Sequence, residues 1–141
     1  MSAAAPRTDH ASLAVEDLDA ALRFYGDAFG YELLFRDEQD EAIAALTGVP
    51  GLRCALAQLR NPSDGSVLEL VRFSDGSVRA LPPAGHIAFR VDDLDAALAR
   101  VQAHGARPLG TTVTFATGRA VYVREPSGSV IELYEPTEDV T

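Results

Sequence analysis

The sequence predicts an α+β domain made of two tandem β-α-β-β-β modules, because the chain repeats itself. HASLAVEDLDAAL from residue 10 and HIAFRVDDLDAAL from residue 86 start 76 residues apart. GSVLEL at 65–70 and GSVIEL at 128–133 close the two copies. Self-similarity at a fixed spacing indicates one structural unit used twice. Each half therefore opens on a histidine and closes on a glutamate.

The elements of each half follow from hydrophobic periodicity. Segments 9–15 and 85–91 alternate or run apolar and predict strands. A helix follows each strand, the first with Asp17 as N-cap and Gly30 as its stop, the second ending at Gly105. The apolar positions of the first helix are Leu18, Ala21, Leu22, Tyr25 and Phe29, and those of the second are Leu94, Ala97, Leu98 and Val101. The remaining strands are predicted at 31–37, 52–60 and 66–73, and at 107–114, 118–124 and 129–135.

The length of the chain fits one domain, residues 1–141. We expect module one over about 8–73, a linker at 74–84 that is rich in turn-forming residues, and module two over about 85–136. The first half is longer by the 13 residues QDEAIAALTGVPG, 39–51. This insertion is either a short helix over the site or a surface excursion.

Composition excludes several classes of protein. The net charge of −9 repels nucleic acid and anionic membranes. The chain has no apolar run long enough to span a membrane, and its start lacks the pattern of a signal peptide, so we expect a cytoplasmic protein. The single Cys54 excludes an internal disulfide and a thiolate cluster, and the lack of lysine excludes Schiff-base chemistry.

The residues that carry chemistry are His10, Glu69, His86 and Glu132. Glu69 and Glu132 interrupt apolar strands, where a carboxylate is costly unless a cation compensates it. Because the same placement occurs in both copies, each opened by a histidine, we expect all four to form one divalent metal site. Two imidazoles and two carboxylates suit Zn, Ni, Co, Mn or Fe.

A plainer alternative stays open at this point. His10 and His86 could be ordinary core or surface histidines. The glutamates would then form structural ion pairs with strand arginines such as Arg72 or Arg90.

The chain resembles the vicinal oxygen chelate superfamily, which includes glyoxalases, methylmalonyl-CoA epimerases, extradiol dioxygenases and fosfomycin and bleomycin resistance proteins. The resemblance covers about residues 8–136. It rests on the opening histidine, VxDLDAAL at each helix start, FYxxxFGYEL at 24–33 and YVREPSGSVIEL at 122–133. It implies two modules whose eight strands form a cupped mixed sheet around a metal, commonly in a homodimer, with a small-molecule substrate that has adjacent oxygens.

The ligand set separates the members of that superfamily. The order His, Glu, His, Glu resembles lactoylglutathione lyase most, whereas epimerases usually have Gln at the position of Glu69. Bleomycin-sequestering members generally lack the set. Extradiol dioxygenases use two His and one Glu, but their acid-base histidine has no counterpart in TTVTFATG, 111–118. An iron-dependent dioxygenase and a metabolite- or antibiotic-binding protein are therefore the two alternatives to a glyoxalase- or epimerase-like lyase or isomerase.

The expected mechanism is proton transfer next to a carbonyl, with a metal acting as Lewis acid. Glu69 and Glu132 are equivalent by the repeat, so either could be the base. His104 lies at a predicted helix end, where a cation favours the helix dipole, and we interpret it as structural. The candidate substrate contacts are Ser12, Arg36, Arg53, Val71, Tyr122 and Tyr134.

Overall fold

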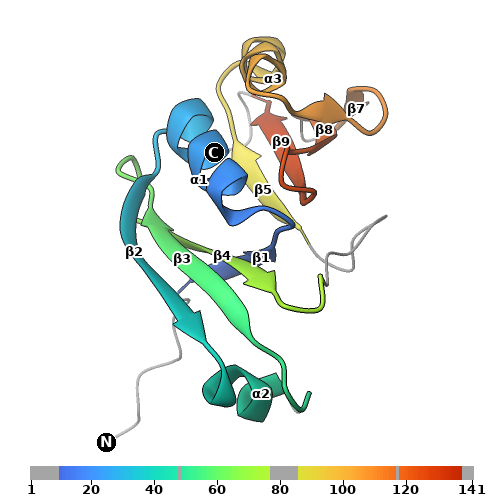
Figure 1. The fold of residues 1–141 in the computed structure, drawn as a ribbon. Helices are drawn as coiled ribbons and strands as arrows, with labels where there is room; N and C mark the ends of the chain where they lie inside the picture. The colour runs from blue at the N-terminus through green and yellow to red at the C-terminus, as the bar shows by residue number, and fades with distance from the viewer. Residues whose placement is uncertain (1–9, 48, 77–85, 117, 138–141) are drawn as a thin grey trace, which may run out of the picture.

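Two mixed sheets, each with a helix against one face, make up the described part of the chain (Figure 1). The computed structural model describes residues 10–47, 49–76, 86–116 and 118–137. In chain order the elements are β1 (Ala11–Ala14), α1 (Leu18–Phe29), β2 (Glu32–Gln39), α2 (Glu41–Thr47), β3 (Cys54–Arg60), β4 (Val67–Phe73), β5 (Ile87–Arg90), α3 (Leu94–Ala103), β6 (Arg107–Pro108), β7 (Val113–Phe115), β8 (Gly118–Arg124) and β9 (Val130–Pro136).

The α+β class and the two modules are confirmed, with two differences in the strands. The first sheet has the order β1-β4-β3-β2 and the second the order β5-β9-β8-β6, with β7 also paired to β8. The strands therefore form separate sheets of four and five strands rather than one sheet of eight. The predicted strand 107–114 is split into β6 and β7, because Pro108 has no N–H to donate and Gly110 lowers strand propensity.

The helix that follows the first strand of each module begins where the sequence predicts; α1 ends directly before the predicted stop at Gly30, and α3 ends at Ala103, two residues before the predicted Gly105. The Asp17 side chain accepts a hydrogen bond from Ala20 N at 3.0 Å, and Asp93 accepts one from Ala96 N at 3.1 Å. Gly30 ends α1 with φ 74°, a left-handed conformation that glycine adopts without strain. The repeated DLDAAL string thus specifies the same capped helix twice.

The inner face of each sheet packs against one shared apolar core. Alternate residues of β1, β3 and β4 in module one and of β8 and β9 in module two belong to a single buried cluster together with α1 and α3. The Phe29 and Phe89 rings stack across the module boundary at 4.8 Å, and Arg100 of α3 donates to the carbonyl oxygen of Ala28 in α1 at 2.7 Å. The outer face of each sheet is therefore turned away from the core that the modules share.

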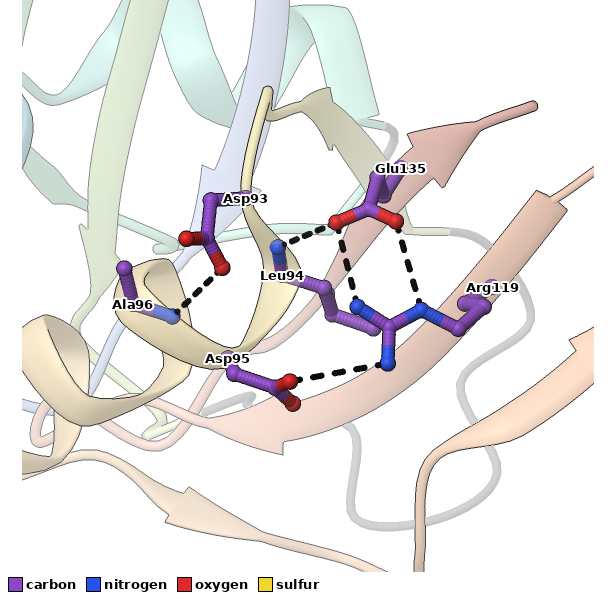
Figure 2. A network of polar contacts seen from close by, with 6 residues as sticks. All are labelled: Asp93, Leu94, Asp95, Ala96, Arg119 and Glu135. Atoms are coloured by element: carbon purple, nitrogen blue, oxygen red, sulfur yellow. Dashed lines mark hydrogen bonds and ion pairs between the residues drawn. The ribbon is translucent and has the colours of Figure 1, made fainter. Parts of the chain in front are cut away.

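A charged network fixes the start of α3 to the second sheet (Figure 2). Glu135 of β9 accepts from Leu94 N at 2.7 Å, where the first turn of the helix leaves its N–H groups unpaired. Arg119 of β8 holds the same carboxylate through Nη2 at 3.1 Å and approaches Asp95 at 3.6 Å. These contacts, and the hydrogen bond from Arg119 above all, lower the pKa of Glu135 and tie the helix to the sheet.

The insertion contains the short helix α2. Figure 1 places α2 beyond the far end of the β2–β3 hairpin, away from α1 and module two. Leu46 of α2 is 83% exposed. Residues 77–85, most of the predicted linker, lie outside the described residues, and no helix in the described ranges is long and apolar enough to cross a membrane.

Candidate metal centre

His10 and Glu69 form the first of two histidine–glutamate pairs. His10 stands just before β1, and Glu69 lies on the neighbouring strand β4 in register with Ser12. His10 Nε2 and Glu69 Oε2 are 3.7 Å apart. Ser12 donates to Glu69 Oε1 at 3.2 Å, and Gln58 of β3 donates to Oε2 at 3.0 Å. Both carboxylate oxygens of Glu69 are therefore held by neutral donors.

His86 and Glu132 form the second pair at the equivalent place in module two. His86 Nε2 lies 2.9 Å from Glu132 Oε1, and the His86 ring meets the edge of Tyr122 at a centroid distance of 4.9 Å. Ala88 and Tyr122 flank Glu132 at the positions where Ser12 and Gln58 flank Glu69. Glu132 is consequently hydrogen-bonded to His86 alone among the described residues.

The two pairs do not meet within one chain. In the described ranges, no group of three or more His, Cys, Asp or Glu side chains is close enough together to hold a metal ion. The reason is the packing of the modules: both pairs lie on outer sheet faces, and the inner faces share the core. A single chain thus presents two half-sites of two ligands each, not the four-ligand site expected from the repeat.

The structure contradicts the alternative in which strand arginines neutralise the glutamates. Arg72 donates through Nε to the carbonyl oxygen of Glu16 at 3.0 Å. Arg90 makes no hydrogen bond or ion pair with any described residue. The side chains of Glu69 and Glu132 are 17% and 18% exposed, and each has its own module's histidine as its basic neighbour. The histidines are therefore the partners of these carboxylates.

Some predicted substrate contacts lie at the half-sites. Ser12 touches Glu69, and Val71 is buried on β4 two residues beyond it. Tyr122 and Glu132 line an apolar hollow of about 250 Å³ on the outer face of the second sheet. Its other walls are Leu109, Gly110, Thr111, Val113, Ala120 and Val121. Tyr134 is half-buried on the same face, two residues past Glu132.

Arg36 and Arg53 lie elsewhere. Arg36 pairs with Asp19 of α1 at 2.7 Å and stands in register with the buried Ala57, on the inner face of the sheet. Arg53 borders a separate hollow that also contains Arg72. Both arginines lie away from the face that carries the glutamates, and their role as substrate contacts stays a prediction.

Two features of the site were not predicted from the sequence. Gln58 holds Glu69, and it would follow from the β3–β4 pairing, which sets Gln58 opposite Glu69. The apolar wall at Leu109 and Val113 follows from the break between β6 and β7, where the sequence predicted one strand over 107–114. Cross-strand register, rather than residue type, is the missing signal in both cases.

Comparison with known proteins gives a family. The family model of the glyoxalase/bleomycin resistance protein/dioxygenase superfamily matches residues 7–133. A probable lactoylglutathione lyase of Vibrio parahaemolyticus is 32% identical over 130 residues, covering 89% of this chain and 88% of that protein. A glyoxalase family protein from Bacillus cereus superposes with a TM-score of 0.76 at 28% identity, covering 95% and 96% of the two chains. An antibiotic binding protein from Streptomyces superposes with a TM-score of 0.63 at 28% identity, covering 96% and 100%. The chain belongs to the glyoxalase/bleomycin resistance protein/dioxygenase superfamily.

Proposed function

We propose that this protein is a metal-dependent lyase or isomerase that moves a proton next to a carbonyl group of a small molecule. The observation that carries the proposal is the pair of matched His–Glu half-sites, one on each outer sheet face. Each half-site offers one imidazole nitrogen and one carboxylate. Together they make the N₂O₂ donor set that suits Zn, Ni, Co, Mn or Fe, and the ion would supply Lewis-acid polarisation of the carbonyl.

A homodimer would complete the site. β1 and β5 are the edge strands next to the half-sites, and in the described ranges each pairs with one neighbour only. Unpaired strand edges favour pairing with another chain. If β5 of a second copy lies beside β1, the outer faces join into one cup, and His10 and Glu69 of one protomer face the second protomer's module two. A two-fold axis gives two such sites per dimer.

The environments of the two glutamates assign their roles. Glu69 is held on both oxygens by Ser12 and Gln58, which favours a fixed ligand. Glu132 has one hydrogen bond to the described residues, to His86, and borders the apolar hollow. A carboxylate that is free to turn towards the substrate and to give up one contact suits proton transfer. Glu132 therefore moves the proton, while Glu69 holds its place.

A binding protein without catalysis is the second candidate. The apolar hollow beside Glu132 would accept a drug-like molecule, and the similarity to an antibiotic binding protein favours this alternative over oxygen chemistry. The two candidates differ in turnover. Conversion of methylglyoxal and glutathione to lactoylglutathione by the metal-loaded protein, lost in Glu132→Gln with the metal retained, would support the lyase. Tight ligand binding with no proton exchange would support the binding protein.

Mixing two variants tests whether the metal site spans two chains. Neither His10→Ala nor His86→Ala alone should bind metal tightly. When an equal mixture of the two variants is dissociated and reassociated, half of the dimers contain one chain of each variant. One of the two sites in each mixed dimer is intact, so about a quarter of all sites should bind metal again. His104→Ala, the remaining histidine, is the control and should bind about one ion per chain. No recovery on mixing would overturn the shared site, and no metal in the control would overturn the metal-dependent function.

A further inference from the structure

Arg90 is a cation without a partner among the described residues, and it lies on the face that carries Glu132. Ala88 and Arg90 follow His86 on β5, and alternate strand residues share a face. Ala88 stands in register with Glu132, and Arg90 with Tyr134. Arg90 therefore lies one row, or roughly 7 Å along the strand, from the row of Glu132. It is exposed and makes no hydrogen bond or ion pair within the described residues.

The other cations of this sheet face are engaged or distant. Arg124 is also one row from Glu132, but its Nη1 donates to the carbonyl oxygen of Gly128 at 2.7 Å. Arg107 is on β6, at the edge of the sheet opposite β5. Arg119 belongs to the inner network around Glu135 (Figure 2). A ligand at Glu132 thus has Arg90 as its one uncommitted basic neighbour in the described part of the sheet.

The repeat shows that Arg90 is not required by the fold. The equivalent position in module one is Ala14, in the otherwise matching strand after His10. Both strands pair in parallel with the last strand of their module, and both start the same capped helix. Since Ala14 serves the architecture equally well, the guanidinium at position 90 adds nothing to the fold that the first module needs.

Resting on the proposed function, we infer that the substrate carries a carboxylate and that Arg90 binds it. The guanidinium fork matches a carboxylate with two parallel hydrogen bonds. The hollow on the other side of Glu132 is lined by Leu109, Val113 and Ala120, so it takes an uncharged end of the substrate. The substrate therefore spans Glu132, with its acid towards β5 and its apolar end towards β7.

A carboxylate fits this site better than a phosphate does. The chain has no lysine and a net charge of −9, so a dianion would meet a repulsive field with one guanidinium against it. Phosphate sites in proteins generally add helix N-termini or several backbone donors. The start of α3 is already occupied by Glu135 and Asp93.

Three hydroxamates with equal chain lengths test the inference, since each offers two adjacent oxygens to a metal. Their far ends are a carboxylate (succinic acid monohydroxamate), the neutral amide and a phosphonate. Affinities are measured by calorimetry on the metal-loaded wild-type protein. A charge-assisted hydrogen-bonded pair is worth roughly a 10- to 100-fold change in affinity, so the carboxylate should bind at least about 10-fold more tightly than the amide.

Substitutions at Arg90 locate that preference. Arg90→Ala should abolish the preference for the carboxylate and leave the amide affinity unchanged, and Arg90→Lys should restore part of it. Arg107→Ala, a basic residue of the same face on the far edge, should keep the full preference. Equal binding of acid and amide by the wild type would overturn the inference while the proposed function stands, and tighter binding of the phosphonate would overturn the assignment of a carboxylate. Failure of all three hydroxamates to bind would overturn the proposed function and this inference with it.

Discussion

Glu125 is a buried carboxylate at the junction of the two modules. It lies in the loop between β8 and β9 and is 2% exposed. Ser127 Oγ donates to its two oxygens at 2.5 and 2.6 Å, and Ser129 N donates at 2.8 Å. The same loop reaches module one, because Ser127 O accepts from Glu16 N at 2.7 Å and Ser129 Oγ donates to Ala14 O. Glu125 therefore shapes the loop that joins the modules.

We expect Glu125→Ala to lower the free energy of unfolding by about 3 kcal/mol. The change leaves Ser127 Oγ and Ser129 N without their acceptor, and each unpaired buried donor costs about 1–3 kcal/mol. Relief of the desolvation of the carboxylate offsets part of that sum. Glu125→Gln keeps one acceptor oxygen, so its loss should be about half as large. Urea unfolding followed by circular dichroism measures both values, with the exposed Glu38→Ala as control.

The pH dependence gives a second measurement on the same variants. Burial raises the pKa of Glu125 above its ordinary 4.5, against the hydrogen bonds from Ser127 and Ser129, which lower it. A group whose pKa is higher in the folded protein contributes its full stabilisation at pH values below its pKa in the unfolded chain. This stabilisation is lost as the pH rises through its pKa in the folded protein. The advantage of the wild type over Glu125→Gln should therefore shrink as the pH rises from 4.5. An Ala variant within 0.5 kcal/mol of the control, or an advantage that grows with pH, would refute the reasoning.

Three further predictions concern single residues of the fold. Tyr25→Phe should change the free energy of unfolding by less than about 1 kcal/mol, or raise it, because among the described residues the buried hydroxyl makes no hydrogen bond of good geometry, although it lies near the Glu125 carboxylate; thermal unfolding measures this. Gly118→Ala should cost about 3 kcal/mol in urea unfolding, because a Cβ there would clash with the carbonyl oxygen of Glu135. Arg119 lowers the pKa of Glu135, so the Arg119–Glu135 contact contributes stability above pH 4.5 and loses it on acidification. The free energy of unfolding of Glu135→Gln should therefore depend less on pH below 4.5 than that of the wild type.

The local structure of this chain follows from its sequence because the determinants are local. Asp17 and Gly30 mark the ends of α1, and the alternation around Glu69 correctly sets that side chain opposite the apolar core. The pairing of each glutamate with the histidine of its own module also follows, since the first and last strands of a β-α-β-β-β unit are neighbours. Each of these conclusions depends only on contacts within one module.

The relation between the modules could not be predicted in the same way. A repeat specifies that Glu69 and Glu132 occupy equivalent places, but it does not specify which faces of the two copies pack together. Apolar contacts such as Phe29 with Phe89 decide that question, and these two residues are not equivalent in the repeat. Packing through the inner faces keeps the two His–Glu pairs apart in one chain, so the proposed four-ligand site would need a second chain.

The differences between the two copies say more about the reaction than the repeat does. Module one surrounds its glutamate with the donors Ser12 and Gln58, whereas module two has Ala88 and Tyr122 at those positions. Module two also has Arg90 at the place of the first module's alanine, and an apolar hollow opens beside its glutamate. In a symmetric dimer each cup would combine one module of each kind. On the proposed function, one wall of the cup would hold a ligand rigidly, and the facing wall would bind the substrate and move the proton.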